Sequence, residues 1–137
     1  MKDGWFNDEY FALFESQEEA ANATARYRLS DYLPGFFVVG LKFWDDFILS
    51  DTNGRYHTVP TVPLVREELR AYSFPAEPLK LRADPKLAGK IKWHVQPIVF
   101  GGSPSKSENI AWISYDAHVE AVIYWNNLFR DLRGKTA

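Results

Sequence analysis

The chain has 137 residues, of which 46% are hydrophobic and 16% aromatic, so it carries enough apolar side-chain area to bury one core and should fold rather than remain disordered. Its formal net charge is −2, which does not favour non-specific binding of nucleic acid through phosphate neutralisation. Cysteine is absent, which excludes disulfides, thiol catalysis and cysteine-ligated zinc.

The beginning of the chain is predicted to form two helices. In the segment 5–15, WFNDEYFALFE, Asn7 can cap a helix and apolar side chains recur on one helical face. A second helix is predicted in SQEEAANATARYRL, where Ser16 and Glu19 have the spacing of a capping box. The sequence Leu-Pro-Gly at 33–35 should end it, because proline cannot continue a helix.

The composition then changes to aromatic and β-branched residues, which indicates strands. Thr-Asn-Gly at 52–54 is typical of a tight turn between two strands. We predict antiparallel strands in three segments, at about 36–42, 45–50 and 55–59.

The C-terminal half is predicted to alternate between short elements and one long helix. Residues 64–72 are assigned to a short helix, and residues 73–90, which contain three prolines, to an irregular basic connection. Strands are expected at 91–100 and 111–114. After Ser114, a plausible N-cap, a stripe of apolar side chains centred on Trp125 indicates an amphipathic helix.

This order of elements predicts an α+β fold for residues 1–137 as a single domain. It comprises one mostly antiparallel sheet, flanking N-terminal helices and a long C-terminal helix packed on the sheet. No run approaches the roughly 18 apolar residues of a membrane span, and the charged N-terminal segment is unlike a signal peptide. We therefore expect a cytoplasmic protein that does not bind membranes.

A glycine-rich stretch at 99–109, VFGGSPSKSEN, has the composition of a phosphate-binding loop. In such a loop, backbone N–H groups wrap the phosphates and a helix follows directly. Here the two glycines are adjacent, Pro104 removes one N–H donor, and a strand is expected next. We therefore interpret the stretch as a connection between two strands.

Few titratable residues have a spacing that favours chemistry. Asp45 and Asp46 would point to opposite faces of a regular strand, so we interpret them as part of a polar turn. His57, His94 and His118 lack the spacing of metal ligands. No catalytic residue, metal or cofactor is therefore expected. The alternative is a small enzyme or ligand-binding domain, which requires Asp45, Asp46, His57 and His94 to converge in one pocket.

The run 18–64 resembles the SUKH superfamily, which includes the fungal cell-wall assembly regulator family and many bacterial immunity proteins of polymorphic toxin systems. The resembling features are the helix leading into YLPGF at 32–36, the strand VVG at 38–40, the strand DFIL at 46–49 and the following NGRYHTVPTVPL. The segment 97–129 is similar to the tail of some bacterial members. The resemblance implies an α+β fold, no catalytic residues, and binding of a partner, often a secreted nuclease-type toxin.

A nuclease toxin is commonly basic, so acidic residues on this chain would speed its association with such a partner. The expected partner is thus a protein and not a nucleic acid. A homo-oligomer that uses Ile123 and Tyr124 is a further alternative. The candidate partner-binding residues are seven carboxylates: Asp8, Glu9, Glu15, Glu18, Glu19, Asp45 and Asp46.

Overall fold

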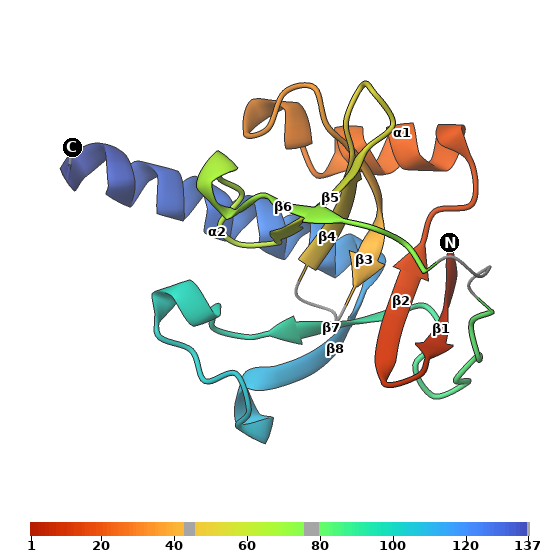
Figure 1. The fold of residues 1–137 in the computed structure, drawn as a ribbon. Helices are drawn as coiled ribbons and strands as arrows, with labels where there is room; N and C mark the ends of the chain where they lie inside the picture. Colours follow the sequence, from red (N-terminus) through yellow and green to blue (C-terminus); the bar gives the residue numbers. More distant parts are fainter. Residues whose placement is uncertain (43–45, 76–79, 137) are drawn as a thin grey trace.

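The computed structural model describes residues 1–42, 46–75 and 80–136 (Figure 1). Its helices are α1 (Gln17–Arg26) and α2 (Tyr115–Thr136), and short 3-10 turns lie at Leu29–Asp31, Arg66–Glu68, Ile98–Phe100 and Ser107–Asn109. Its strands are β1 (Lys2–Phe6), β2 (Glu9–Leu13), β3 (Phe37–Lys42), β4 (Asp46–Ser50), β5 (Tyr56–Pro60), β6 (Arg70–Tyr72), β7 (Lys90–His94) and β8 (Ile110–Ser114).

Strands β1 to β6 form one antiparallel sheet in the order of the chain, and β7 pairs with β8 in a second, two-stranded antiparallel sheet. The α+β class, the mostly antiparallel pairing and the long C-terminal helix are confirmed. Figure 1 shows α2 running behind the six-stranded sheet, and its C-terminal turns extend beyond the sheet. The C-terminal strands, which were expected in the same sheet, instead form a separate layer.

The predicted helix at 5–15 is wrong, because this segment contributes to the hairpin β1–β2. Asn7 and Asp8 form a two-residue turn between the paired residues Phe6 and Glu9. Asn7 has a φ of 55°, a conformation that asparagine tolerates better than most residues. The turn therefore reverses the chain direction within a segment whose apolar spacing predicts a continuous helix.

The edge strand β1 of this hairpin is hydrogen-bonded to a segment that lies far along the chain. Trp5 and Arg82 exchange two backbone hydrogen bonds of 2.8 Å. A Cβ atom on Gly4 would lie 2.8 Å from the carbonyl oxygen of Arg82, so this close approach requires glycine. Part of the expected irregular connection at 73–90 thus pairs with the edge of the sheet.

Helix α1 begins as predicted, because the Ser16 hydroxyl accepts a hydrogen bond of 3.0 Å from the Glu19 N–H. Strands β3, β4 and β5 lie in the expected segments. The predicted helix at 64–72 is wrong: its residues form only one 3-10 turn followed by β6. The expected strand at 91–100 ends at His94, ahead of the buried Pro97.

The core lies between α1, α2 and both sheets. Its largest fully buried side chain is Tyr27, whose ring contacts Phe47 at 4.8 Å and His118 at 5.6 Å between centroids. The Tyr27 hydroxyl, whose pKa burial raises well above its ordinary value, forms a hydrogen bond of 2.7 Å with Nδ1 of His118. His118 is fully buried, and desolvation lowers its pKa to about 3, so the imidazole is neutral in the folded protein.

Candidate functional site

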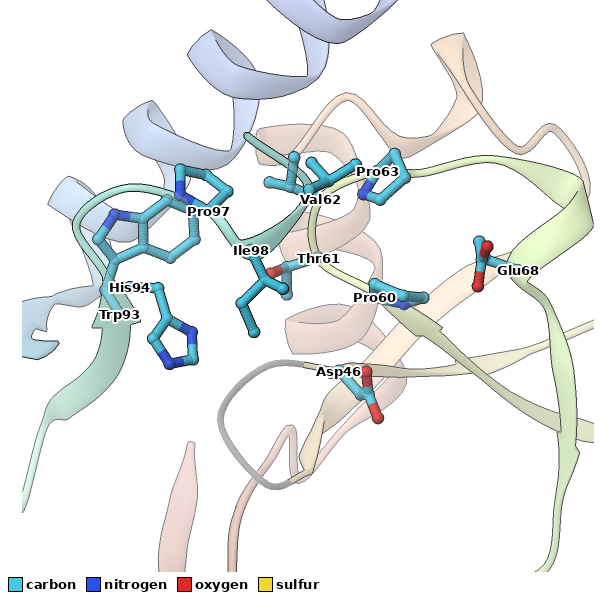
Figure 2. Close-up of a pocket in the computed structure, with 11 residues that line it drawn as sticks. Asp46, Pro60, Thr61, Val62, Pro63, Glu68, Trp93, His94, Pro97 and Ile98 are labelled. Atoms are coloured by element: carbon cyan, nitrogen blue, oxygen red, sulfur yellow. The ribbon is translucent and has the colours of Figure 1, made fainter. Parts of the chain in front are cut away.

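A pocket of about 370 Å³ lies between the two sheets and is the best candidate site in the described part of the chain (Figure 2). One wall comes from β4, β5 and the segment that follows β5. The other wall comes from the end of β7 and the 3-10 turn that follows it. Among the residues that the structure describes, the lining is mostly apolar, and Asp46, Glu68 and His94 are its titratable members.

The first wall is a proline-rich turn that a buried asparagine holds in place. Pro60 ends β5 opposite Asp46, the first residue of β4. Beyond it, Oδ1 of Asn126 accepts a hydrogen bond of 2.8 Å from the Leu64 N–H, and its Nδ2 donates to the Thr61 carbonyl at 2.8 Å. Asn126 is 2% exposed and lies on α2, so this helix fixes the shape of the wall. No local signal in the sequence marks this role of Asn126, because its two partners lie 62 and 65 positions away along the chain.

The second wall owes its exposed apolar side chains to the 3-10 turn Ile98–Phe100. Successive side chains in such a turn point about 120° apart. Phe100 packs onto α2, with ring centroids 5.0 Å from Trp125 and 6.4 Å from Phe129. Ile98 and Val99 therefore face away from the helix, and they remain 49% and 45% exposed beside the pocket.

The glycine-rich stretch continues this wall, and hydrogen bonds of the Asn109 side chain hold it against Gln96 and Ser103. The Asn109 side chain accepts a hydrogen bond of 2.7 Å from the Gln96 N–H and donates bonds of 3.0 and 2.8 Å to the Gln96 and Ser103 carbonyls. A Cβ atom on Gly102 would lie 1.8 Å from the Gln96 carbonyl oxygen, so only glycine fits there. A 3-10 turn and β8 follow, which agrees with a connection between strands and not with a phosphate-binding loop.

His94, 6% exposed, is fixed at the edge of the pocket. Its Nε2 donates a hydrogen bond of 3.3 Å to the Pro104 carbonyl, because a carbonyl oxygen can only accept. This bond orients the imidazole and connects β7 to the glycine-rich stretch.

The structure brings together only part of the four-residue pocket that the enzyme alternative requires. Asp46 and His94 line the same pocket, whereas Asp45 lies outside the described residues. His57 is absent from the pocket lining: its Nε2 lies 3.0 Å from Oδ2 of Asp51, and its ring packs on Phe36. The hydrogen bond from His57, with backbone donors, holds the pKa of Asp51 below its ordinary value.

The candidate carboxylates near the N-terminus do not form one patch. Asp8 and Glu9 lie at the turn between β1 and β2, whereas Glu15 and Glu18 lie beyond the opposite end of β2. Five residues of strand separate these groups by roughly 13 Å. Glu19 makes an ion pair of 2.5 Å with the amino group of Met1. Contact of these residues with a partner stays a prediction.

Three further predictions concern metal binding, membrane insertion and an oligomer that uses Ile123 and Tyr124. In the described ranges, no three His, Cys, Asp or Glu side chains are arranged to hold a metal ion. Neither helix there combines the length and apolar character that a bilayer span needs. Tyr124, one of the residues considered for a homo-oligomer, is 61% exposed and packs edge-on against Trp125, while Ile123 is half-buried.

No protein-family model matches this chain, and no curated protein or solved structure is detectably similar to it. The resemblance to the SUKH superfamily stays a prediction from short motifs. A functional assignment therefore depends on the geometry of the pocket and its surroundings.

Proposed function

We propose that this chain is a non-catalytic protein-binding module, with a docking surface formed by the pocket and by Ile98 and Val99 beside it. The partner is a basic protein, of the nuclease-toxin kind that the SUKH resemblance implies. The observation that supports this most directly is a group of exposed aliphatic side chains next to a pocket with two carboxylates.

Exposed apolar residues that cluster beside polar groups are typical of interaction sites. Val95 is 52% exposed, close to the values for Ile98 and Val99, and all three lie within one short segment. Phe100 anchors this segment to α2, so a partner would meet a surface that is already ordered. Preordered side chains lose little conformational entropy on binding, which favours affinity.

The charge of the pocket favours a basic partner. Asp46 and Glu68 contribute two carboxylates, and neither lysine nor arginine is among the lining residues in the described part of the chain. A negative patch raises the association rate of a positively charged protein and disfavours acidic competitors.

A small-ligand site is the second candidate function, since Asp46 and His94 share the pocket. Its volume lies at the lower end of the roughly 300–1,000 Å³ of ligand sites. On this alternative, a small molecule should saturate the pocket in a thermal-shift assay, and an Asp46→Asn variant should lose the shift. Saturable binding of a small molecule by wild type, together with no binding of a protein partner, would favour this second candidate.

The test of the proposed function is coexpression with the product of the gene directly upstream. Wild type should restore growth when that product is toxic, and calorimetry should show a one-to-one complex. Ile98→Glu should weaken the complex at least about tenfold, since it places a charge in a buried contact. The matched control is Phe37→Glu on β3, a residue 45% exposed and outside the pocket lining. Absence of both binding and protection would contradict the proposal.

A further inference from the structure

We propose that the pocket between the sheets receives one cationic side chain, arginine or lysine, of the partner; this inference rests on the proposed function and specifies its central contact. The hydrocarbon stem of that side chain lies against Pro60, Pro97 and Ile98. Its charged end lies at the carboxylates of Asp46 and Glu68.

The apolar part of the pocket suits a flexible hydrocarbon stem. Three prolines, Pro60, Pro63 and Pro97, contribute to the lining, and their rings lose no side-chain entropy on binding. Figure 2 shows Ile98 between the Trp93 side of the pocket and Thr61. Lysine and arginine bury their methylene groups on such surfaces while the charged end stays at a polar edge. Trp93 adds aromatic surface to the apolar side of the pocket, away from the carboxylates.

The carboxylates occupy one side of the pocket. Figure 2 shows Asp46 and Glu68 on either side of Pro60, away from Trp93 and Pro97. Asp46 comes from the start of β4, and Glu68 from the 3-10 turn before β6. A ligand that enters along the apolar wall therefore meets negative charge at one end only, which matches a side chain with a stem and a single charged group.

Two basic residues near these carboxylates lie outside the pocket lining. Lys42, the cross-strand partner of Asp46, has its Nζ 4.8 Å from the centre of the Tyr72 ring. Arg70, two residues after Glu68, donates hydrogen bonds of 2.9 Å to the carbonyls of Glu67 and Leu69. Neither residue lines the pocket.

Glu67 and Glu68 are adjacent on one 3-10 turn, but their side chains lie in different surroundings. Glu67 pairs with Arg133 of α2 at 3.3 Å, and this pairing contributes to the lowered pKa of Glu67. Glu68, the next residue, points about 120° away and lines the pocket. Glu67 is therefore a matched control for Glu68, since both are exposed carboxylates on the same turn.

Other ligand types fit less well. An anion would be repelled by both carboxylates. A wholly apolar group would remove water from the carboxylates without replacing their hydrogen bonds, which is costly. A cation with a hydrocarbon stem satisfies both parts of the lining.

The first test uses two probes that differ in charge, N-acetyl-argininamide and its neutral isostere N-acetyl-citrullinamide. In NMR titrations at millimolar concentration, the arginine probe should shift the Trp93 indole N–H and the Ile98 methyl signals. The citrulline probe, Asp46→Asn and Glu68→Gln should each weaken this binding about threefold to tenfold, whereas Glu67→Gln should not. Equal shifts by both probes, or equal loss in Glu67→Gln, would overturn the inference.

The second test separates this inference from the proposed function. The same variants are titrated with the purified upstream gene product at two salt concentrations. Glu68→Gln should weaken the complex and reduce its salt dependence, whereas Glu67→Gln should match wild type. Wild-type affinity in Asp46→Asn and Glu68→Gln would overturn the inference but leave the protein-binding function intact. Binding of the arginine probe without any protein partner would instead contradict the proposed function alone.

Discussion

His118 and His94 lie in opposite surroundings, although Trp93 is next to both. The Trp93 ring contacts His118 at 5.3 Å in the core, and Trp93 also lines the pocket together with its neighbour His94. His118 is enclosed by aromatic rings and stays neutral, whereas His94 holds the edge of an open site. If the proposed function is correct, the interior should determine stability and the pocket should determine partner binding, so changes to the two regions should be separable.

The largest expected effect follows from truncating the aromatic interior. Tyr27→Ala removes the ring contacts with Phe47, Tyr115 and His118 and leaves a cavity. It should lower the free energy of unfolding by about 3–5 kcal/mol in urea titrations. Tyr124→Ala, at a residue 61% exposed, is the control and should change it by less than about 0.5 kcal/mol. Similar losses in both variants would mean that the interior is not the stabilising region.

The next largest effect is expected at Asn126, which is buried in the interior and also supports the pocket wall. A change there should lower both stability and partner binding. Asn126→Ala leaves the Leu64 N–H and the Thr61 carbonyl without their partners, which should cost about 2–4 kcal/mol of stability and also weaken partner binding. Asn127→Ala, the exposed neighbour that accepts a hydrogen bond from Tyr32, should cost no more than about 1 kcal/mol. A destabilised Asn126→Ala variant with unchanged affinity would show that the pocket wall is held by other contacts.

A pH dependence should follow from the neutral state of His118. The unfolded chain binds a proton at this residue with a pKa near 6.5, whereas the folded protein binds it only near 3. The unfolded state therefore holds more protons in this window, and stability falls as the pH falls through it. Between pH 7.5 and 4.5 this residue alone should remove roughly 2–3 kcal/mol.

The control for this pH dependence is the double variant Tyr27→Phe/His118→Leu, which removes both partners of the buried hydrogen bond. Its urea stability should depend less on pH than that of wild type, and the difference isolates His118. The lowered pKa values of Asp51 and Glu67 act mainly below the ordinary carboxylate range, outside this window. Parallel pH profiles for both proteins would mean that His118 is protonated in the folded state.

The smallest effect on stability is expected at the pocket surface. Glu68→Gln and Ile98→Ser change exposed side chains, so urea titrations should give values within about 0.5 kcal/mol of wild type. Partner affinity measured on the same samples should nevertheless fall. A loss of stability equal to the loss of binding would remove the distinction between the two regions.

The elements that could be predicted from sequence are those with local signals. Ser16 with Glu19 marked the start of α1, and Ser114, whose hydroxyl accepts from the Ala117 N–H at 3.1 Å, marked the start of α2. The hairpin β1–β2 was missed because its apolar residues also fit a helical period. The Asn7-Asp8 pair was the available signal for a turn, but the contact of Gly4 with Arg82 is non-local.

The candidate site could be predicted only in part, because it also depends on non-local contacts. Asp46 and His94 were singled out, yet they are 48 positions apart and their meeting depends on how the two sheets pack. Glu68 looked like an ordinary helix-surface residue because segment 64–72 was assigned to a helix. His57 looked equivalent to His94, but its pairing with Asp51 across the β4–β5 turn occupies it elsewhere.

Two hydrogen bonds between the Asn109 side chain and the Gln96 backbone join the two ends of the segment 96–109. Asn109 and Gln96 fix the ends of this segment, and the backbone carbonyls of Ser103 and Pro104 in its middle accept hydrogen bonds from Asn109 and His94. Ser105 and Lys106 contribute backbone N–H groups to this segment, so these contacts do not depend on their exposed side chains. The surface that these two side chains present can thus change between related sequences while the pairing of β7 with β8 is retained.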